Sequence, residues 1–174
     1  YTLDLEKVYV SGGVFVSHYS SIKKKINTYP AIEASYAIAK HARIIASYNE
    51  AMRLPTFTDL YYSGPTNVGN ADLKPEKSRT MELGAKYTKE GLQIQTSAFV
   101  RNGNNIIEWV KTSTDPANAL WKTQNLTHIK TTGINLSVNI TQALLADTDM
   151  LRQLSINYTW LDLKADADRG ETKY

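Results

Sequence analysis

The chain has 174 residues, of which 42% are hydrophobic and 21% charged, with a mean hydropathy of −0.37 and a net charge of +3. No stretch approaches the roughly 18 consecutive apolar residues of a spanning helix, which excludes helical membrane proteins but not membrane β-barrels, whose strands alternate apolar and polar residues. Cysteine is absent, which excludes disulfides and thiolate metal sites, and the dispersed basic residues argue against a nucleic-acid partner.

Alternation of apolar and polar residues predicts an all-β chain. In the strand expected from residue 78, Met81, Leu83 and Ala85 fall on one side, and Glu82 with the other even-numbered residues falls on the opposite side. The segment after residue 42 is less regular, because Ile45 lies among polar residues. Seven long strands are expected, at residues 6–17, 30–40, 42–51, 78–89, 92–111, 119–143 and 150–163.

The connections between these strands alternate in length. Tight turns are expected at 40–42 and 89–91, where Gly91 can adopt positive φ, and a somewhat longer turn near 145–150. Long connections are expected at 18–29, 52–77 and 112–118, and a tail follows from Lys164. Short turns on one rim, long loops on the other and strands above the soluble average of about 5–6 residues are typical of an outer-membrane barrel.

The passage from 53 to 87 joins the longest expected connection to the most regular strand. Pro55 and Asp59 favour one helical turn, which would leave Tyr61 and Tyr62 near a loop surface. Pro75 withholds a backbone donor and pushes the preceding residue into an extended conformation. The next strand is therefore expected to begin only after Pro75.

This passage resembles the barrel repeat of TonB-dependent outer-membrane receptors, the nutrient transporters of Gram-negative bacteria. In that repeat an Arg-x-Pro and a Leu-Tyr pair precede Gly-Asn-x-x-Leu-Lys-Pro-Glu and a strand bearing Glu-x-Gly. Asn125 with Gly133 resembles the family's next segment more weakly. The matching residues are Arg53, Pro55, Leu60, Tyr61, Gly69, Asn70, Leu73, Lys74, Pro75, Glu76, Glu82 and Gly84.

The resemblance implies that residues 1–174 are part of a 22-stranded transmembrane β-barrel, without its plug domain and the amino-terminal box that contacts the TonB complex. It implies import of a scarce, large nutrient of the ferric-siderophore or vitamin B12 type across the outer membrane, in contact with outer-membrane lipid. Four aromatic residues of the outer loops are candidate ligand contacts, with support of the loop or of the membrane belt as the alternative: Tyr61, Tyr62, Trp109 and Trp121.

Two other architectures fit the length: a complete small outer-membrane barrel of eight strands and a soluble β-sandwich binding module. An enzyme is not expected, because His18, His41 and His128 are far apart and no nucleophile elbow or phosphate-binding glycine loop is present. No cofactor or metal is expected. An isolated piece of seven strands would have unpaired edges, which favour edge-to-edge association.

Overall fold

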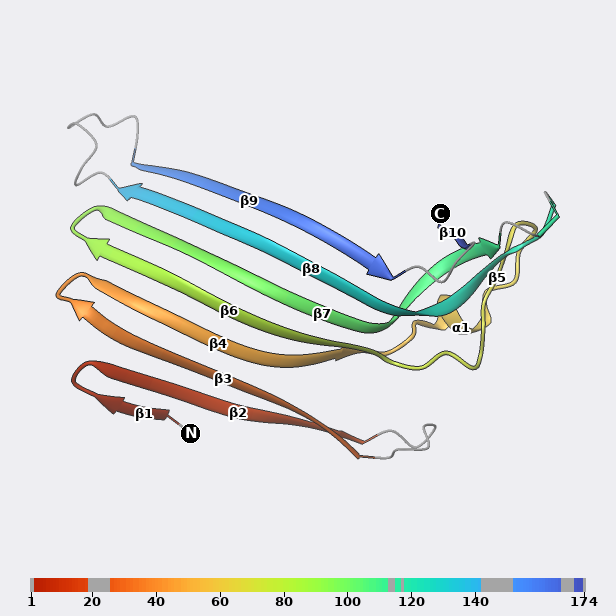
Figure 1. Cartoon of the computed structure of the whole chain (residues 1–174), viewed down its shortest axis with the longest axis horizontal. Coiled ribbons are helices and arrows are strands. Elements are labelled where there is room, and N and C mark those ends of the chain that lie inside the picture. Colours follow the sequence, from red (N-terminus) through yellow and green to blue (C-terminus); the bar gives the residue numbers. More distant parts are fainter. Residues whose placement is uncertain are drawn as a thin grey trace. The chain divides into compact units, whose positions relative to one another are not determined.

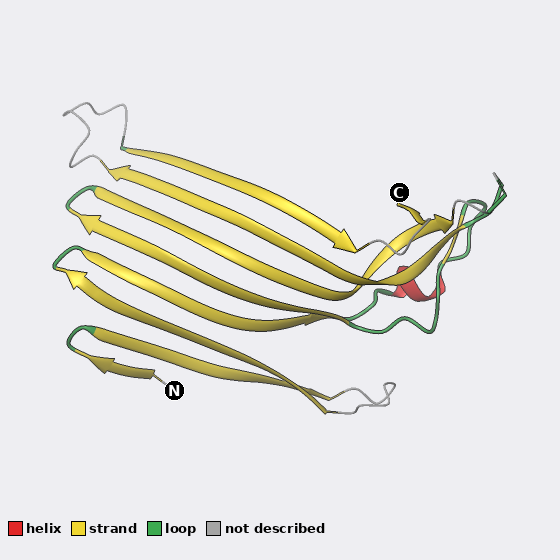
Figure 2. Ribbon diagram, in the orientation of Figure 1, coloured by secondary structure: helices red, strands yellow, loops and turns green. Residues whose placement is uncertain are grey.

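The computed structural model describes residues 2–18, 26–112, 115–116, 118–141, 152–166 and 171–173. Strands account for nearly all of it, and one short helix interrupts them (Figures 1 and 2). The elements are β1 (Thr2–Leu5), β2 (Val8–His18), β3 (Ile26–Ala39), β4 (Ala42–Arg53), α1 (Phe57–Tyr61), β5 (Asn67–Val68), β6 (Glu76–Lys89), β7 (Leu92–Thr112), β8 (Trp121–Thr141), β9 (Gln153–Asp166) and β10 (Glu171–Lys173).

The strands pair mainly with their neighbours in sequence. The hydrogen-bonded order is β1-β2-β3-β4-β6-β7-β8, with β9 also paired to β8. Two short strands depart from this order, because β5 pairs in parallel with the start of β8 and β10 pairs with the end of β7. The prediction of an all-β antiparallel meander with seven long strands is confirmed, and those strands have 11 to 21 residues.

Three tight turns connect β1 to β2, β3 to β4 and β6 to β7, and they lie together at one end of the strands in Figure 1. The turns expected at 40–42 and 89–91 are confirmed at residues 40–41 and 90–91, and Gly91 has a φ of 70°. The turn expected near 145–150 lies outside the described residues.

Several expected boundaries are wrong. The strand expected from residue 6 begins at Val8, because residues 6–7 form the turn from β1. Residues 26–29, expected in a loop, belong to β3 and pair with the end of β2. Residues 164–166 extend β9, and the tail adds β10. In both places backbone pairing with an adjacent strand extends the sheet beyond the regular alternation.

The described chain divides into two compact units, which are taken separately. The first comprises Tyr1–Glu50, Thr80–Val100 and Thr132–Asp162. In this unit Tyr36 lies opposite Val8 and Ile44, whereas Ser35 lies opposite Tyr9 and Ile45. Ile45 therefore lies on the polar face, as the sequence predicted.

The exposure of the two faces in this unit is the reverse of that in a water-soluble sheet. Met81 and Leu83 are 63% and 60% exposed, whereas Thr80 and Ser97, on the polar face, are 6% and 7% exposed. Leu136 and Ile156, of the apolar sets on β8 and β9, are also exposed. A sheet with an apolar outward face needs a non-aqueous environment on that side, which is what lipid supplies to a barrel wall.

Apolar side chains also occur on the polar face. Phe99, whose sequence neighbours on its side of β7 are polar, lies over Gly133, together with Leu161. A Cβ at Gly133 would lie 2.6 Å from the Phe99 ring and 2.7 Å from Cδ2 of Leu161. A larger residue at position 133 would have to displace the ends of these two side chains.

The second unit comprises Ala51–Arg79, Arg101–Thr131 and Leu163–Tyr174. It contains helix α1, strand β5 and the ends of the strands from which the long connections leave. Its buried centre is small and includes Ile107, Val110 and Thr123, of which Thr123 is fully buried. The only helix in the described part of the chain has five residues, so no described helix is long and apolar enough to cross a membrane.

Candidate functional site

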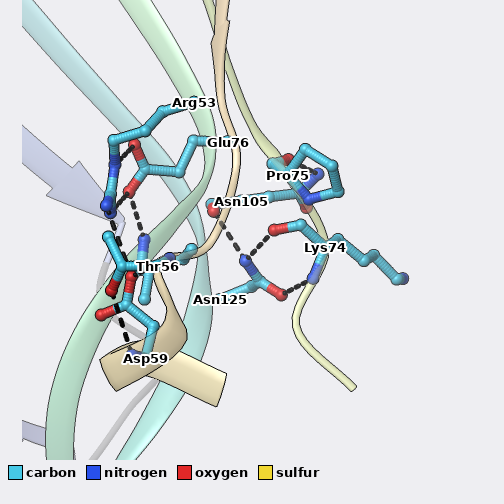
Figure 3. Close-up of polar contacts among 9 residues, drawn as sticks. Arg53, Thr56, Asp59, Lys74, Pro75, Glu76, Asn105 and Asn125 are labelled. Atoms are coloured by element: carbon cyan, nitrogen blue, oxygen red, sulfur yellow. Dashed lines mark hydrogen bonds and ion pairs between the residues drawn. The ribbon is translucent and has the colours of Figure 1, made fainter. Parts of the chain in front are cut away.

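Most residues of the family-like repeat, from Arg53 to Glu76, lie in the second unit, where a set of polar contacts fixes the connection from residue 54 to residue 75 (Figure 3). We call this set the loop clasp; it comprises Arg53, Asp59, Asn70, Lys74, Glu76, Asn105, Thr123 and Asn125. At its centre is a bidentate ion pair between Arg53 and Glu76. Arg53 donates from Nε to Oε2 of Glu76 at 2.7 Å and from Nη2 to Oε1 at 2.6 Å.

Glu76 also ties this pair to the neighbouring strand β7, because the backbone N–H of Ile107 donates to its Oε1 at 2.9 Å. Glu76 is the first residue of the 14-residue strand β6, and a tilted strand crosses a membrane with about 9–11 residues, so this carboxyl lies outside the spanning segment. Burial raises the pKa of Glu76, but the hydrogen bonds from Arg53 and Ile107 outweigh it and hold that pKa below its usual value.

Helix α1 is fixed at its start by a capping box. The Thr56 hydroxyl accepts from the backbone N–H of Asp59 at 3.1 Å, and the Asp59 carboxylate accepts from the backbone N–H of Thr56 at 2.8 Å. The helical turn predicted after Pro55 is thus confirmed. The same carboxylate is 3.4 Å from Nη1 of Arg53, which links the helix to the ion pair.

Asn125 holds the far end of the connection through three bonds to backbone atoms. Its Oδ1 accepts from the Lys74 N–H at 2.8 Å, and its Nδ2 donates to the carbonyl of Lys74 at 2.9 Å and to that of Asn105 at 2.7 Å. Asn105 has a φ of 55°, which an asparagine tolerates better than most residues. One side chain of β8 therefore fixes both β7 and the segment that leads into β6.

Close backbone approach explains the glycine and the asparagine of the Gly-Asn pair. A Cβ at Gly69 would lie 2.8 Å from the carbonyl oxygen of Asp59, so no larger residue fits. The N–H of Asn70 donates to that same oxygen at 2.9 Å, and the Thr123 hydroxyl donates to it at 2.8 Å. Asn70 also accepts from the N–H of Asp72, which forms the turn before the strand.

The remaining residues of the repeat make no clasp bond; they are half-buried or occupy a position where the backbone of a neighbouring strand lies close. Pro55, Leu60 and Leu73 are half-buried, next to the clasp in sequence. In the first unit, Glu82 lies on the polar face, and a Cβ at Gly84 would lie 2.7 Å from the carbonyl oxygen of Thr96. Gly84 therefore allows β6 and β7 to approach closely. Pro75 directly precedes β6, which confirms the expected start of that strand.

The four aromatic candidates do not form one site in the described contacts. Tyr62 meets Trp109 edge to face with ring centroids 6.2 Å apart, and its ring covers Gly64. Trp121 lies under Nζ of Lys111, which is 5.2 Å from the ring centroid. These contacts give Tyr62, Trp109 and Trp121 structural partners within the loop region.

Tyr61 is different, because it pairs with a residue that sequence reasoning missed. Phe57 and Tyr61 lie one turn apart on α1 with ring centroids 5.0 Å apart, and they are 78% and 58% exposed. The spacing of four residues on an expected helical turn was the available signal. The missed clasp members Asn105 and Thr123 have no such signal, because Asn105 bonds to Asn125, 20 residues away, and Thr123 bonds to Asp59, 64 residues away.

Comparisons with known proteins agree with this geometry. A family model described as "TonB dependent receptor-like, beta-barrel" matches residues 1–174. The vitamin B12 transporter BtuB of Vibrio vulnificus is 28% identical, with the match covering 76% of this chain and 23% of that protein. BtuB of Photobacterium profundum is 24% identical, covering 82% of this chain and 21% of that protein. The chain thus spans less than a quarter of the length of these relatives.

Solved structures support the same fold. The siderophore receptor PirA from Pseudomonas aeruginosa has a TM-score of 0.72 at 20% identity, over 94% of this chain and 30% of that one. The copper transporter OprC has a TM-score of 0.62 at 17% identity, over 92% of this chain and 27% of that one. At these identities the likeness concerns the fold alone. Together with the full-length family match, the loop clasp and the outward apolar face, it shows that the chain belongs to the TonB-dependent receptor β-barrel family.

Proposed function

We propose that residues 1–174 form wall strands and outer loops of a receptor that imports a large, scarce nutrient across the outer membrane of a Gram-negative bacterium. The cargo would be of the ferric-siderophore or vitamin B12 type, and the inner-membrane TonB complex would supply the energy. The rest of the barrel, the plug domain and the segment that contacts the TonB complex would belong to the remainder of the polypeptide. Catalysis has no part in this proposal.

One observation carries the proposal beyond family membership: the side chains that alternate along the strands divide into an outward apolar set and a covered polar set. Met81 and Leu83 on the exposed face would meet lipid, and Thr80 and Glu82 would face the barrel interior. A soluble sandwich would instead bury the apolar set between two sheets. In such a receptor the tight turns would lie on the periplasmic rim, and the long connection at residues 54–75 would be an outer loop.

The loop clasp supports different roles for the residues of the outer loop: some would hold the loop in place and others would face the ligand. Because Arg53, Glu76 and Asn125 bond to other parts of the protein, they would hold the loop in one conformation. Phe57 and Tyr61 would be the ligand-facing residues, since their rings lie on a fixed helical turn and remain mostly exposed. The other three aromatic residues would stabilise the loop: Tyr62 contacts Trp109, and Trp121 contacts Lys111.

Uptake by the complete receptor tests the proposal. The gene that contains residues 1–174 would be expressed in cells that lack their own vitamin B12 and siderophore receptors, and growth would be followed with cyanocobalamin or with a panel of ferric siderophores. We expect growth on one cargo class, loss of that growth when the TonB gene is deleted, and an outer-membrane band with heat-modifiable gel mobility. Uptake that persists without TonB, or a product that is soluble without detergent, would refute the proposal.

A further inference from the structure

A group of exposed cations lies in the second unit, on the side of the strands opposite the polar face. On β6, Lys77 and Arg79 are exposed and alternate with the buried Thr80. Since side chains alternate along a strand, both cations lie on the side that further along β6 carries the exposed Met81. The side that would meet lipid in the proposed barrel thus becomes cationic toward the start of β6.

Strands β8 and β9 add two cations on the same side. Asn135 lies on the polar face, where its Nδ2 donates to Oγ of Ser97 at 3.5 Å and its Oδ1 accepts from Thr159 at 3.0 Å. Lys130 is five residues before Asn135, and Lys164 is five residues after Thr159. Because five is an odd number of steps, both lysines lie on the other side of the sheet, and antiparallel pairing makes them neighbours across the two strands. Both are exposed.

Strand β7 lies between these two pairs of cations. A Cβ at Gly84 on β6 would lie 3.5 Å from Cα of Ser97 on β7. Five residues further toward the long connections, the same register brings Arg79 beside Asn102, and the contact of Ser97 with β8 brings Asn102 beside Lys130. Since neighbouring strands are about 4.7–4.9 Å apart, the backbones at Arg79 and Lys130 are about 10 Å apart. We call the four side chains on these strands the cationic patch: Lys77, Arg79, Lys130 and Lys164.

In the proposed barrel the cationic patch would lie at the depth of the lipid head groups. The segment from Arg79 to the tight turn at residues 90–91 matches the roughly 9–11 residues with which a tilted strand crosses a membrane. On this side of the segment the exposed Met81 and Leu83 follow the patch. Trp160, four residues before Lys164, is 48% exposed, and tryptophan is enriched where hydrocarbon meets head groups. A lipid whose chains cover the apolar side chains would therefore bring its head group to the patch.

The cationic patch adjoins the loop clasp through the backbone. Lys77 directly follows Glu76 of the clasp on β6. Asn104, whose Oδ1 lies 3.2 Å from Nδ1 of His128, directly precedes Asn105 of the clasp on β7. A ligand held by the patch would therefore restrain the stretches of β6 and β7 to which the clasp bonds.

We infer that the cationic patch binds the two phosphate groups of an outer-leaflet lipid of the lipid A type, and that this lipid thereby stabilises the base of the outer loop. Lysine and arginine bind phosphate through charge-assisted hydrogen bonds. Asp162, two residues before Lys164 on the same side of β9, adds one carboxylate, so the four cations leave an excess of positive charge that favours an anionic lipid. A lipid with two phosphates fits a patch that extends from β6 to β9 better than a lipid with one. The inference rests on the proposed function, because only an outer-membrane barrel brings this side to the outer leaflet.

Titration of the complete receptor with lipid A tests the inference, after the receptor has been purified in detergent and freed of bound lipid. The variant Lys77→Gln/Arg79→Gln/Lys130→Gln is expected to bind lipid A about 100-fold more weakly than the wild type, because each cation beside an anionic lipid contributes a factor of about five. The matched control is Lys7→Gln/Lys40→Gln/Lys89→Gln, which removes the same charge at the tight turns and should keep the wild-type affinity.

Hydrogen exchange measures the effect of the lipid on the loop. Saturating lipid A should slow the amide exchange of residues 68–74 at least threefold in the wild-type receptor. The same concentration should leave that exchange unchanged in the triple variant of the cationic patch.

Several results would overturn the inference. Binding of lipid A by the patch variant within threefold of the wild type is one, and equal weakening in the control is another. Equal affinity for lipid A without its phosphates would assign binding to the acyl chains alone, and displacement of lipid A by an equal concentration of pyrophosphate would indicate a site for free anions. Binding that leaves the exchange of residues 68–74 unchanged would refute the effect on the loop. Heat-modifiable mobility and uptake report separately on the proposed function, so an assembled, transporting receptor that does not bind lipid A refutes the inference alone.

Discussion

Replacement of Asn125 by alanine is the sharpest test of the loop clasp. The substitution removes three hydrogen bonds of 2.7 to 2.9 Å, two to Lys74 and one to Asn105, and adds no bulk. With a net value of about 0.5–1.5 kcal/mol each, the three bonds together stabilise the closed loop by roughly 1.5–4.5 kcal/mol. At 1.4 kcal/mol per factor of ten, loop opening becomes about 10- to 1,600-fold more frequent.

Hydrogen exchange of the complete receptor in detergent measures this opening directly. Amides of residues 68–74 are expected to exchange faster by that factor in Asn125→Ala, whereas amides of residues 92–100 keep the wild-type rate. The matched control is Asn104→Ala, which removes one exposed contact to His128 and leaves the clasp intact. Asn125→Asp keeps the acceptor for the Lys74 N–H but turns a carboxylate oxygen toward the carbonyl oxygens of Lys74 and Asn105, so exchange at least as fast as in Asn125→Ala is expected.

The physical reasoning fails if Asn125→Ala changes the amide exchange of residues 68–74 by less than about threefold. It also fails if Asn125→Ala and Asn104→Ala have equal effects. Either result would mean that other contacts set the backbone conformation of the loop. The three hydrogen bonds would then form as a consequence of that conformation and would not stabilise it.

Three further predictions address the wall, the loop glycine and the ion pair. In the complete receptor, Leu83→Arg should cost about 2–4 kcal/mol at mid-membrane depth and reduce the heat-modifiable assembled fraction, whereas Gln93→Arg on the polar face should assemble normally. Gly69→Ala places a Cβ 2.8 Å from backbone atoms of α1 and should make the loop sensitive to protease, whereas Gly13→Ala meets nothing within 4 Å and should not. The lowered pKa of Glu76 means that its stabilising effect is complete above about pH 4.5 and is lost as pH falls through its folded-state pKa; hydrogen exchange of the loop should rise there, and Glu76→Gln should lack this rise.

The sequence predicted the strands well because the two faces of a barrel wall differ in chemistry at every second residue. Met81, Leu83 and Ala85 fix the register of β6, and Pro75 fixes its start, since it cannot donate to the sheet. The short turn at residues 6–7 was missed, because neither Glu6 nor Lys7 is a residue that favours turns.

The family-like repeat located the important loop but did not reveal how it works. Asn125 was only a weak match in sequence, yet it makes three of the bonds that close the clasp. Its partner Lys74 is 51 residues away, and a side chain that bonds to backbone atoms at that distance leaves no periodic pattern. Strand β5 was missed for a related reason, since its two-residue parallel pairing with β8 depends on backbone atoms.

The clasp has a consequence for how such a receptor diverges. Its bonds run to backbone atoms and to a few side chains at the base of the loop, and none of them involves the exposed side chain of Phe57 or Tyr61. On the function proposed above, substitution of Phe57 or Tyr61 would therefore change the side chains offered to a cargo and leave the clasp bonds in place. Cargo preference would then change through two side chains of α1, with no rearrangement of the loop backbone.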